Sequence, residues 1–338
     1  MKIRLQNKIA ESALTLPITC VVTALLWWLP QGGYSLEYLL GLLTCALTAF
    51  LVIKTATANA LLRIRSQMIA VLFLWFLAVC GFLHPLQPGT IIVCCFSISF
   101  FYLLRTYDND GPEVDTFHAY LFIALASLVW APLLWLSIVM FWCHLFYLRS
   151  LSWRCFGAVL CGLLLPYLFW AAGAFYLNDV SPLLEHCTSI ISPFNERFYW
   201  QWVIDDAIQY EWSSFWSLFL SKFHDMFLHH LPEGVALLVV FLFGLTGLVH
   251  YSRKNFDDKI RVRMCHYCYM VFQIVLFLWI LLRPQEFMYL FPLLLLSTAP
   301  TAAHFITLTH TWITNVWSII LSLGLVAVSI ITLFHNPS

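Results

Sequence analysis

Charged residues are scarce in this sequence. Only 10% of the 338 residues are Asp, Glu, Lys or Arg, whereas 62% are hydrophobic. In soluble globular proteins about a quarter of all residues are charged, so an ordinary soluble globular protein is excluded. Disordered and collagen-like chains are also excluded, because 17% of the residues are aromatic. The composition indicates a protein that crosses a lipid bilayer several times.

The chain also lacks the signatures of several activities. With 17 basic and 17 acidic residues it has no net charge, so no nucleic-acid partner is expected. It contains no G-x-x-x-x-G-K-[ST] loop, which excludes a P-loop ATPase within the chain. Of the 11 cysteines only Cys187 is expected away from the helices, so no disulfide framework is predicted. Cys265 and Cys268 have the C-x-x-C spacing of two cysteines that share a metal ion. No second pair of ligands accompanies them, so no metal site is predicted.

Charge-free apolar runs divide the chain into expected membrane spans of roughly 20 residues each. The run at 117–148 is too long for one helix, and Pro132 pushes Ala131 out of helical geometry, so we expect two helices joined by a tight turn. The other runs lie at 14–29, 38–53, 68–82, 90–104, 155–177, 235–251, 265–282, 288–308 and 313–334. The sequence thus predicts an all-α, polytopic transmembrane helical bundle of about 11 helices.

Lys and Arg residues test this topology, because they accumulate in cytoplasmic loops. With a cytoplasmic N-terminus, all 17 cations except Arg197, Lys222 and Arg283 fall on the inner side. We therefore expect an N-terminal membrane bundle at 1–177 with about seven spans. An outer, periplasmic loop follows at 178–233, and a C-terminal membrane bundle with about four spans occupies 234–338.

The second half of the outer loop has a helical period. Trp212, Trp216 and Phe219 recur at three- and four-residue steps, and Ser213 and Ser217 fall on the opposite face. This pattern predicts an amphipathic helix over 212–228 that lies in the outer membrane interface. Its aromatic face is either a membrane contact or a platform for a lipid substrate.

The same loop holds the groups that most resemble a reaction centre. Adjacent carboxylates can hold a cation or share a proton, so Asp205, Asp206 and Glu196 are the candidate catalytic residues; the alternative is a solvated surface. The candidate substrate-binding residues are Arg197, Arg283, Glu286, Trp212 and Trp216. An arginine fork suits a phosphate, but each arginine also has a glutamate nearby with which it could simply pair.

The expected spans contain no Asp, Glu, Lys or Arg. The ionisable groups expected inside them are His118, His144, His266 and His304. Ion-coupled transporters generally keep a charged residue at membrane depth, so this pattern argues against secondary active transport.

Two stretches resemble known proteins. The segment 283–296, with Arg283, Pro284 and Pro292, resembles the late arginine-then-proline span of membrane glycosyltransferases that use polyprenyl-phosphate sugars. Ser152-Trp153-Arg154, followed by residues 162–167, is similar to an uncharacterised family of bacterial polytopic inner-membrane proteins. The large, late outer loop is similar to that of lipid-linked glycan polymerases and O-antigen ligases. These resemblances imply a place in the bacterial inner (plasma) membrane and a polyprenyl-linked glycan as the partner.

Three functions from different classes are consistent with these observations. The first is transfer of a glycan or lipid-linked sugar at the outer face, with carboxylates of the long loop activating an acceptor hydroxyl. The second is a non-enzymatic scaffold or assembly factor whose outer loop docks a periplasmic protein. The third is a facilitative or lipid transporter. The sequence assigns no cofactor.

Overall fold

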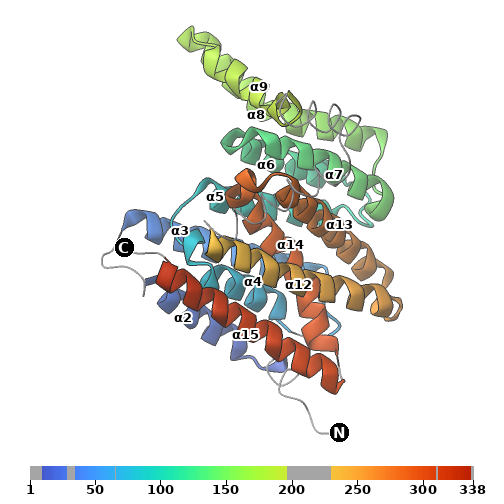
Figure 1. The fold of residues 1–338 in the computed structure, drawn as a ribbon. Coiled ribbons are helices and arrows are strands. Elements are labelled where there is room, and N and C mark those ends of the chain that lie inside the picture. The colour runs from blue at the N-terminus through green and yellow to red at the C-terminus, as the bar shows by residue number, and fades with distance from the viewer. Residues whose placement is uncertain (1–9, 29–34, 65, 196–229, 310, 336–338) are drawn as a thin grey trace, which may run out of the picture.

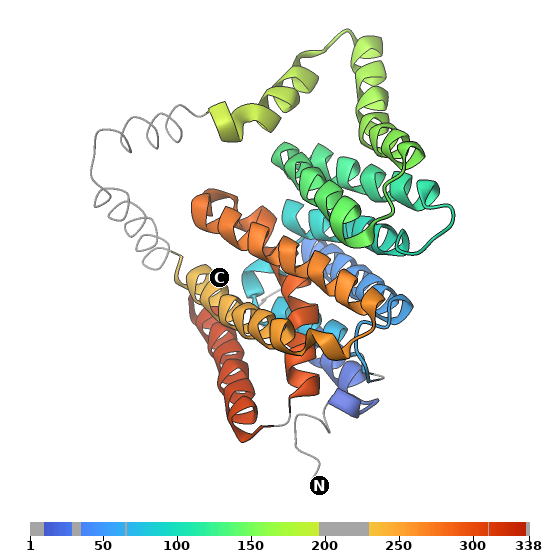
Figure 2. The ribbon, with the colours of Figure 1, turned by 90° about the vertical axis from the view of Figure 1, so that its right-hand side faces the viewer.

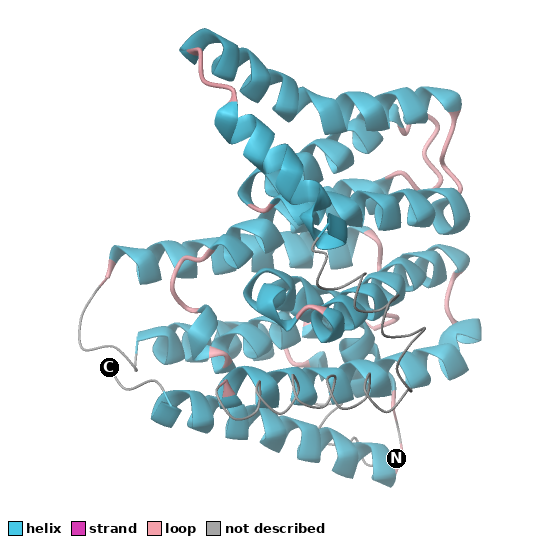
Figure 3. Cartoon of the chain, turned by 45° about the horizontal axis from the view of Figure 1, so that its top comes forward, coloured by secondary structure: helices cyan, strands magenta, loops and turns pink. Residues whose placement is uncertain are grey.

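The computed structural model describes residues 10–28, 35–64, 66–195, 230–309 and 311–335, and the regular elements of this part are all helical (Figures 1 and 3). The α-helices are α2 (Thr15–Trp28), α3 (Leu36–Ala58), α4 (Met68–Val79), α5 (Pro88–Arg105), α6 (Glu113–Val129), α7 (Leu136–Cys143), α8 (Trp153–Leu177), α9 (Ser181–Asn195), α12 (Leu231–Lys254), α13 (Ile260–Leu282), α14 (Phe287–Leu308) and α15 (Trp312–His335). Short helical segments are η1 (Gly81–Leu83), η2 (Ala131–Trp135), η3 (His144–Leu148), η4 (Asn255–Asp257) and η5 (Pro284–Glu286).

The bundle is that of an integral membrane protein. Among the described residues, 8 helical segments are long and apolar enough to cross a membrane. Each apolar run identified in the sequence contains a helix, but α2 and α4 are shorter apolar helices of 14 and 12 residues, and α6 has 17. The all-helical architecture is therefore confirmed, and the number of eleven spans stays a prediction.

Local sequence determines where several helices begin and end. The side chain of Ser152 caps α8 by accepting a hydrogen bond from the backbone N–H of Cys155. The expected break before Pro132 is confirmed, because α6 ends at Val129, Trp130 is extended, and η2 begins at Ala131.

Part of the expected outer loop is helical. Helix α9 occupies Ser181–Asn195, and α12 begins at Leu231, four residues before the expected run at 235. The side chain of Trp135, in η2, donates a hydrogen bond of 2.9 Å to the backbone oxygen of Ile190, in α9. A short helix with mixed polar and apolar residues does not form a long apolar run, which is why the search for membrane spans missed α9. The helix expected over 212–228 lies outside the described residues.

The connections between helices gather at two ends of the bundle. At one, which we call the Asp258 end, the α3–α4 connection meets the α12–α13 connection through Arg63 and Asp258. At the same end Ser150, between α7 and α8, donates a hydrogen bond to Thr106, after α5. Every described Lys and Arg except Arg283 lies in or next to these connections: Lys54, Arg63, Arg105, Arg149, Arg154, Arg253, Lys254, Lys259, Arg261 and Arg263.

At the opposite end, which we call the Arg283 end, aromatic rings join the other connections. Phe82, in η1, lies 6.0 Å from Phe287 at the start of α14. Trp130, between α6 and η2, stacks on Tyr289 at 5.0 Å. Helices that alternate between these two ends form the up-and-down arrangement expected of a multi-pass protein.

Helix α14 is the centre of the bundle (Figure 2). It packs against α4, α5, α12 and α13, and the apolar part of this segment is wholly buried. Two prolines, Pro292 and Pro300, lie inside it. Helix α8, in contrast, packs mainly on α6 and leaves large side chains such as Phe169, Phe175 and Tyr176 exposed. In a bilayer such a face contacts lipid.

Candidate functional site

Most residues that the sequence singled out cannot be placed. Glu196, Arg197, Asp205, Asp206, Trp212 and Trp216 all lie outside the described residues. Their roles stay predictions.

Arg283 and Glu286 are described, and they pair with each other. Nη1 of Arg283 lies 2.7 Å from Oε1 of Glu286, and both side chains are largely buried. The indole N–H of Trp279 donates a hydrogen bond of 2.7 Å to the other carboxylate oxygen. Of the two interpretations that the sequence left open for Arg283, pairing with the nearby glutamate is what the structure contains. A role in substrate binding stays a prediction.

A second, unexpected group of ionisable residues lies at the Asp258 end. The carboxylate of Asp258, between α12 and α13, is 1% exposed and contacts two side chains from other segments. One oxygen accepts a hydrogen bond from Nε of Arg63. The other is bonded to Nε2 of His304, in α14, at 3.2 Å. A buried carboxylate thus joins three parts of the chain.

Arg63 lies at the edge of this network. Its side chain is 35% exposed. It also donates through Nη2 to the backbone oxygen of Lys254 at 3.1 Å, and its Nη1 lies 3.6 Å from the exposed carboxylate of Asp257. Because it follows α3 and contacts the end of α12, Arg63 ties the two connections together.

Three aromatic rings surround the imidazole of His304 inside the bundle. Tyr251 meets it edge-on at 4.7 Å, His250 lies at 5.4 Å and His266 at 5.6 Å. Tyr251 and His266 stack on each other at 4.4 Å. We refer to Asp258, His304, His266, His250 and Tyr251 as the histidine cluster.

Several polar atoms of the histidine cluster have no hydrogen-bond partner within the described part of the chain. They are Nδ1 of His304, Nε2 of His266, Nε2 of His250 and the hydroxyl of Tyr251. An ionised carboxylate only accepts hydrogen bonds, so Nε2 of His304 donates to Asp258, and Nδ1 is the ring nitrogen without a hydrogen-bond partner in the described chain. Buried polar groups are normally satisfied, so this concentration of unpartnered atoms makes the histidine cluster the candidate site.

The electrostatics of Asp258 favour its ionised form. Burial raises the pKa of this carboxyl, but the hydrogen bonds and charges of His304 and Arg63 outweigh burial, and the pKa lies below its ordinary value. The cluster therefore holds a permanent negative charge beside an imidazole.

Polar side chains continue from His304 towards the middle of the bundle. Thr301, one turn earlier on α14, donates a hydrogen bond of 3.1 Å to the side-chain oxygen of Gln273, in α13. Gln273 packs on Gly244, in α12. A Cβ atom added at Gly244 would lie 2.1 Å from the side-chain nitrogen of Gln273. The polar path thus runs from a loop into a membrane span.

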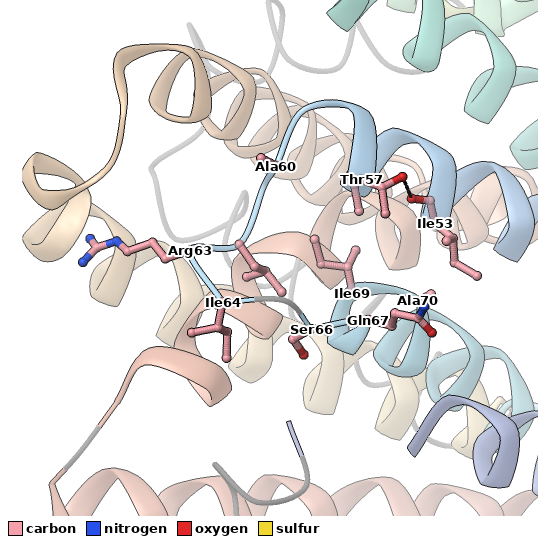
Figure 4. A pocket seen from close by; sticks show the side chains of 11 residues that line it. Ile53, Thr57, Ala60, Arg63, Ile64, Ser66, Gln67, Ile69 and Ala70 are labelled. Atoms are coloured by element: carbon pink, nitrogen blue, oxygen red, sulfur yellow. Dashed lines mark hydrogen bonds between the residues drawn. The ribbon is translucent and has the colours of Figure 1, made fainter. Parts of the chain in front are cut away.

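A cavity of about 330 Å³ lies beside the network, between the end of α3 and the start of α4. Ile53, Ala56 and Ile69 give it an apolar wall, whereas Thr57 and Arg63 contribute polar groups. Figure 4 shows the Arg63 side chain extending away from the other labelled residues. The α3–α4 connection therefore borders both the cavity and the ionic network.

Sequence reasoning found part of this site. His266 and His304 were identified as ionisable groups inside spans, whereas His250 was missed although it lies in the expected run at 235–251. Arg63 was only counted among the cations of the inner side, and Asp258 was not singled out. No local signal identifies their contact, because 195 residues separate them.

The histidine cluster can bind and release a proton, since it combines an imidazole with a buried carboxylate. In the described part of the chain, no group of three or more His, Cys, Asp or Glu side chains has the arrangement of a metal site. All 11 cysteines are free. No protein-family model, curated protein or solved structure matches the chain.

Proposed function

We propose that this integral membrane protein is a transporter that moves an anionic, lipid-linked precursor of the bacterial cell envelope across the inner membrane. The observation that carries the proposal is the contact of Asp258 with both Arg63 and His304. Ionisable groups buried in a membrane protein are costly, and they commonly belong to transport pathways. The uncharged spans argued against this function, but Asp258 supplies the missing carboxylate from a loop.

The orientation is part of the proposal. The cations grouped at the Asp258 end support a cytoplasmic location for that end and a periplasmic location for the Arg283 end. The substrate class comes from the resemblance of 283–296 to enzymes of polyprenyl-linked sugars. A phosphate-bearing lipid also suits a protein whose outward surface, as on α8, is apolar.

The test uses the full chain in lipid vesicles that contain a fluorescently labelled polyprenyl-diphosphate sugar. A quencher that cannot cross the membrane measures how fast the labelled head group changes leaflet. The wild-type protein is expected to accelerate this exchange and Asp258→Asn to abolish the acceleration. Asp110→Asn is the matched control, because this carboxylate is exposed at the same end. Unaccelerated exchange by the wild type, or full activity of Asp258→Asn, contradicts the proposal.

Transfer of the lipid-linked sugar at the periplasmic face is a second candidate. One described feature favours it: Trp130, Trp279 and Tyr289 form an aromatic cluster next to the Arg283–Glu286 pair. Aromatic rings and an arginine together suit a sugar phosphate. In this proposal Asp205, Asp206 and Glu196 activate the acceptor, Arg197 and Arg283 hold phosphate, and Trp212 and Trp216 contact the lipid.

Mass spectrometry of the same vesicles separates the two functions, because transfer lengthens the glycan and transport leaves its mass unchanged. If transfer occurs, Asp205→Asn with Asp206→Asn should abolish the longer product. Glu185→Gln, at an exposed position of α9, provides the control. An unchanged glycan mass with an added acceptor present excludes the transferase.

A further inference from the structure

The carboxylate of Asp258 has two cationic or potentially cationic neighbours. Arg63 is permanently charged, and His304 becomes charged when it takes up a proton. With His304 neutral, the negative charge of Asp258 balances Arg63. With His304 protonated, two cations share one carboxylate, and the repulsion between the cations weakens the binding of one of them to Asp258.

Arg63 is the partner that can leave. His304 is fixed inside α14 and its side chain is 1% exposed, whereas the Arg63 side chain reaches water and lies in a connection. Its remaining ion pair, with the exposed Asp257 at 3.6 Å, is screened by solvent. The loss of its bond to Asp258 therefore removes the buried ionic link between the α3–α4 and α12–α13 connections, and leaves the hydrogen bonds from Arg63 to the backbone oxygen of Lys254 and from Arg261 to Asn59.

His304 is the member of the cluster best placed to take the proton. Among the three cluster histidines, His304 alone forms a hydrogen bond to a carboxylate in the described chain, so Asp258 compensates the added charge. Its free Nδ1 faces no donor in the described chain. The other titratable or charged groups near this contact are His250, Tyr251 and Lys254 on α12, Asp257 before Asp258, and Arg263, Cys265, His266 and Tyr267 on α13; α5 carries Tyr102 and Arg105 towards this end, and α4 carries none.

We propose that a proton controls the α3–α4 connection of this protein: uptake at Nδ1 of His304 and binding of Arg63 to Asp258 exclude each other. The proton comes from the aqueous phase at the Asp258 end and returns there when Arg63 binds again, so it switches the connection and is not itself transported. This inference rests on the proposed transport function, and it names the group that regulates it. Proton uptake then loosens the bundle at the α3–α4 connection, beside the cavity.

Hydrogen–deuterium exchange of the detergent-solubilised full chain tests this mechanism without substrate. Exchange of peptides covering 59–67 and 255–259 is compared at about pH 8 and about pH 6, after correction for the intrinsic rate. The wild type should exchange about tenfold faster at the lower pH in both segments. Peptides of α5 should not change.

Two variants identify the group responsible. His304→Gln keeps an N–H that can reach Asp258 but cannot take up a proton, so both segments should stay protected at either pH. The Arg63→Gln variant lacks the ionic link to Asp258, so both segments should exchange fast at either pH. His118→Gln, on the surface of α6 at the same end, should behave as the wild type.

A wild-type response that is absent, or one that persists in His304→Gln, overturns the inference. Vesicle transport by a protein whose connections ignore pH would refute proton control through this contact while leaving the transport function intact. Conversely, pH-dependent opening without lipid movement would support the proton site and refute the proposed function.

Discussion

Asp258 and His304 lie 46 residues apart in the chain, yet their side chains share a hydrogen bond inside the bundle. The carboxylate comes from a loop and the imidazole from α14, whose apolar stretch is wholly buried. A polar contact of this kind holds a loop against a membrane span. Its contribution to folding can be measured separately from its contribution to function.

Replacement of Asp258 should destabilise the protein. Asp258→Asn removes the charge that compensates Arg63 and should cost about 2 kcal/mol, less than a fully buried pair because Arg63 reaches water. Arg63→Gln leaves the carboxylate with His304 and should cost about 1 kcal/mol. The double variant should lose less than the sum, which thermal unfolding in detergent measures. Strict additivity would show that the two side chains do not interact.

His84 should control stability in mild acid. It stacks on Trp27 at 4.2 Å, and burial lowers its pKa to about 4. An unfolded histidine titrates near 6.5, so the unfolded state binds the proton first. Stability is therefore lost progressively as the pH falls from about 6.5 to about 4, by up to about 3 kcal/mol in total.

The variant His84→Gln isolates this effect, because glutamine can keep a hydrogen bond to the oxygen of Ala78 without titrating. Between pH 6.5 and pH 4, its unfolding midpoint in denaturant should change less than that of the wild type. Equal slopes for the two proteins would assign the acid sensitivity to other groups. Asp258 adds to the acid sensitivity only at lower pH. The pKa of its carboxyl is depressed, so its stabilising charge is lost only when the pH falls through that lowered value.

Gly89 should be intolerant of a larger side chain. A Cβ atom there would lie 2.1 Å from the backbone oxygen of Met288, so α5 and α14 would have to separate. Gly89→Ala should lower the free energy of unfolding by about 3 kcal/mol. Gly157→Ala, where no atom lies within 4 Å, should leave the melting temperature unchanged or slightly higher. A stable Gly89→Ala protein would argue against this packing.

The proposed orientation can be tested with thiol reagents that do not cross membranes. Cys187 is exposed on α9 and should react from outside intact cells. Phe256→Cys, at a largely exposed position of η4, should react only after the cells are opened. Phe256 is a better site than Asn255, which is buried and bonded to Tyr267. Reaction of Phe256→Cys in intact cells, with Cys187 protected, would invert the topology.

Hydrophobic runs predicted the helices because the membrane requires long apolar segments with satisfied backbones. Pro132 even located a break between two of them. Helix α9 was missed, since its 15 residues are partly polar and it packs on η2 rather than filling a span. Asp258 was missed for a different reason: its burial depends on Arg63 and His304, and no periodicity encodes contacts between distant segments. The expected site at 196–216 has not been tested, because it lies outside the described residues.

Pro300 lies one turn before His304 in the buried helix α14. A proline has no N–H to give to the preceding turn, so the helix is easiest to bend at that point. The last turns, with His304, can therefore tilt while the stretch between Pro300 and Phe287 stays packed. Movement at the Asp258 end would be absorbed within a few residues, and the aromatic contacts at the Arg283 end would keep that end closed. Such a bundle would open to one compartment at a time.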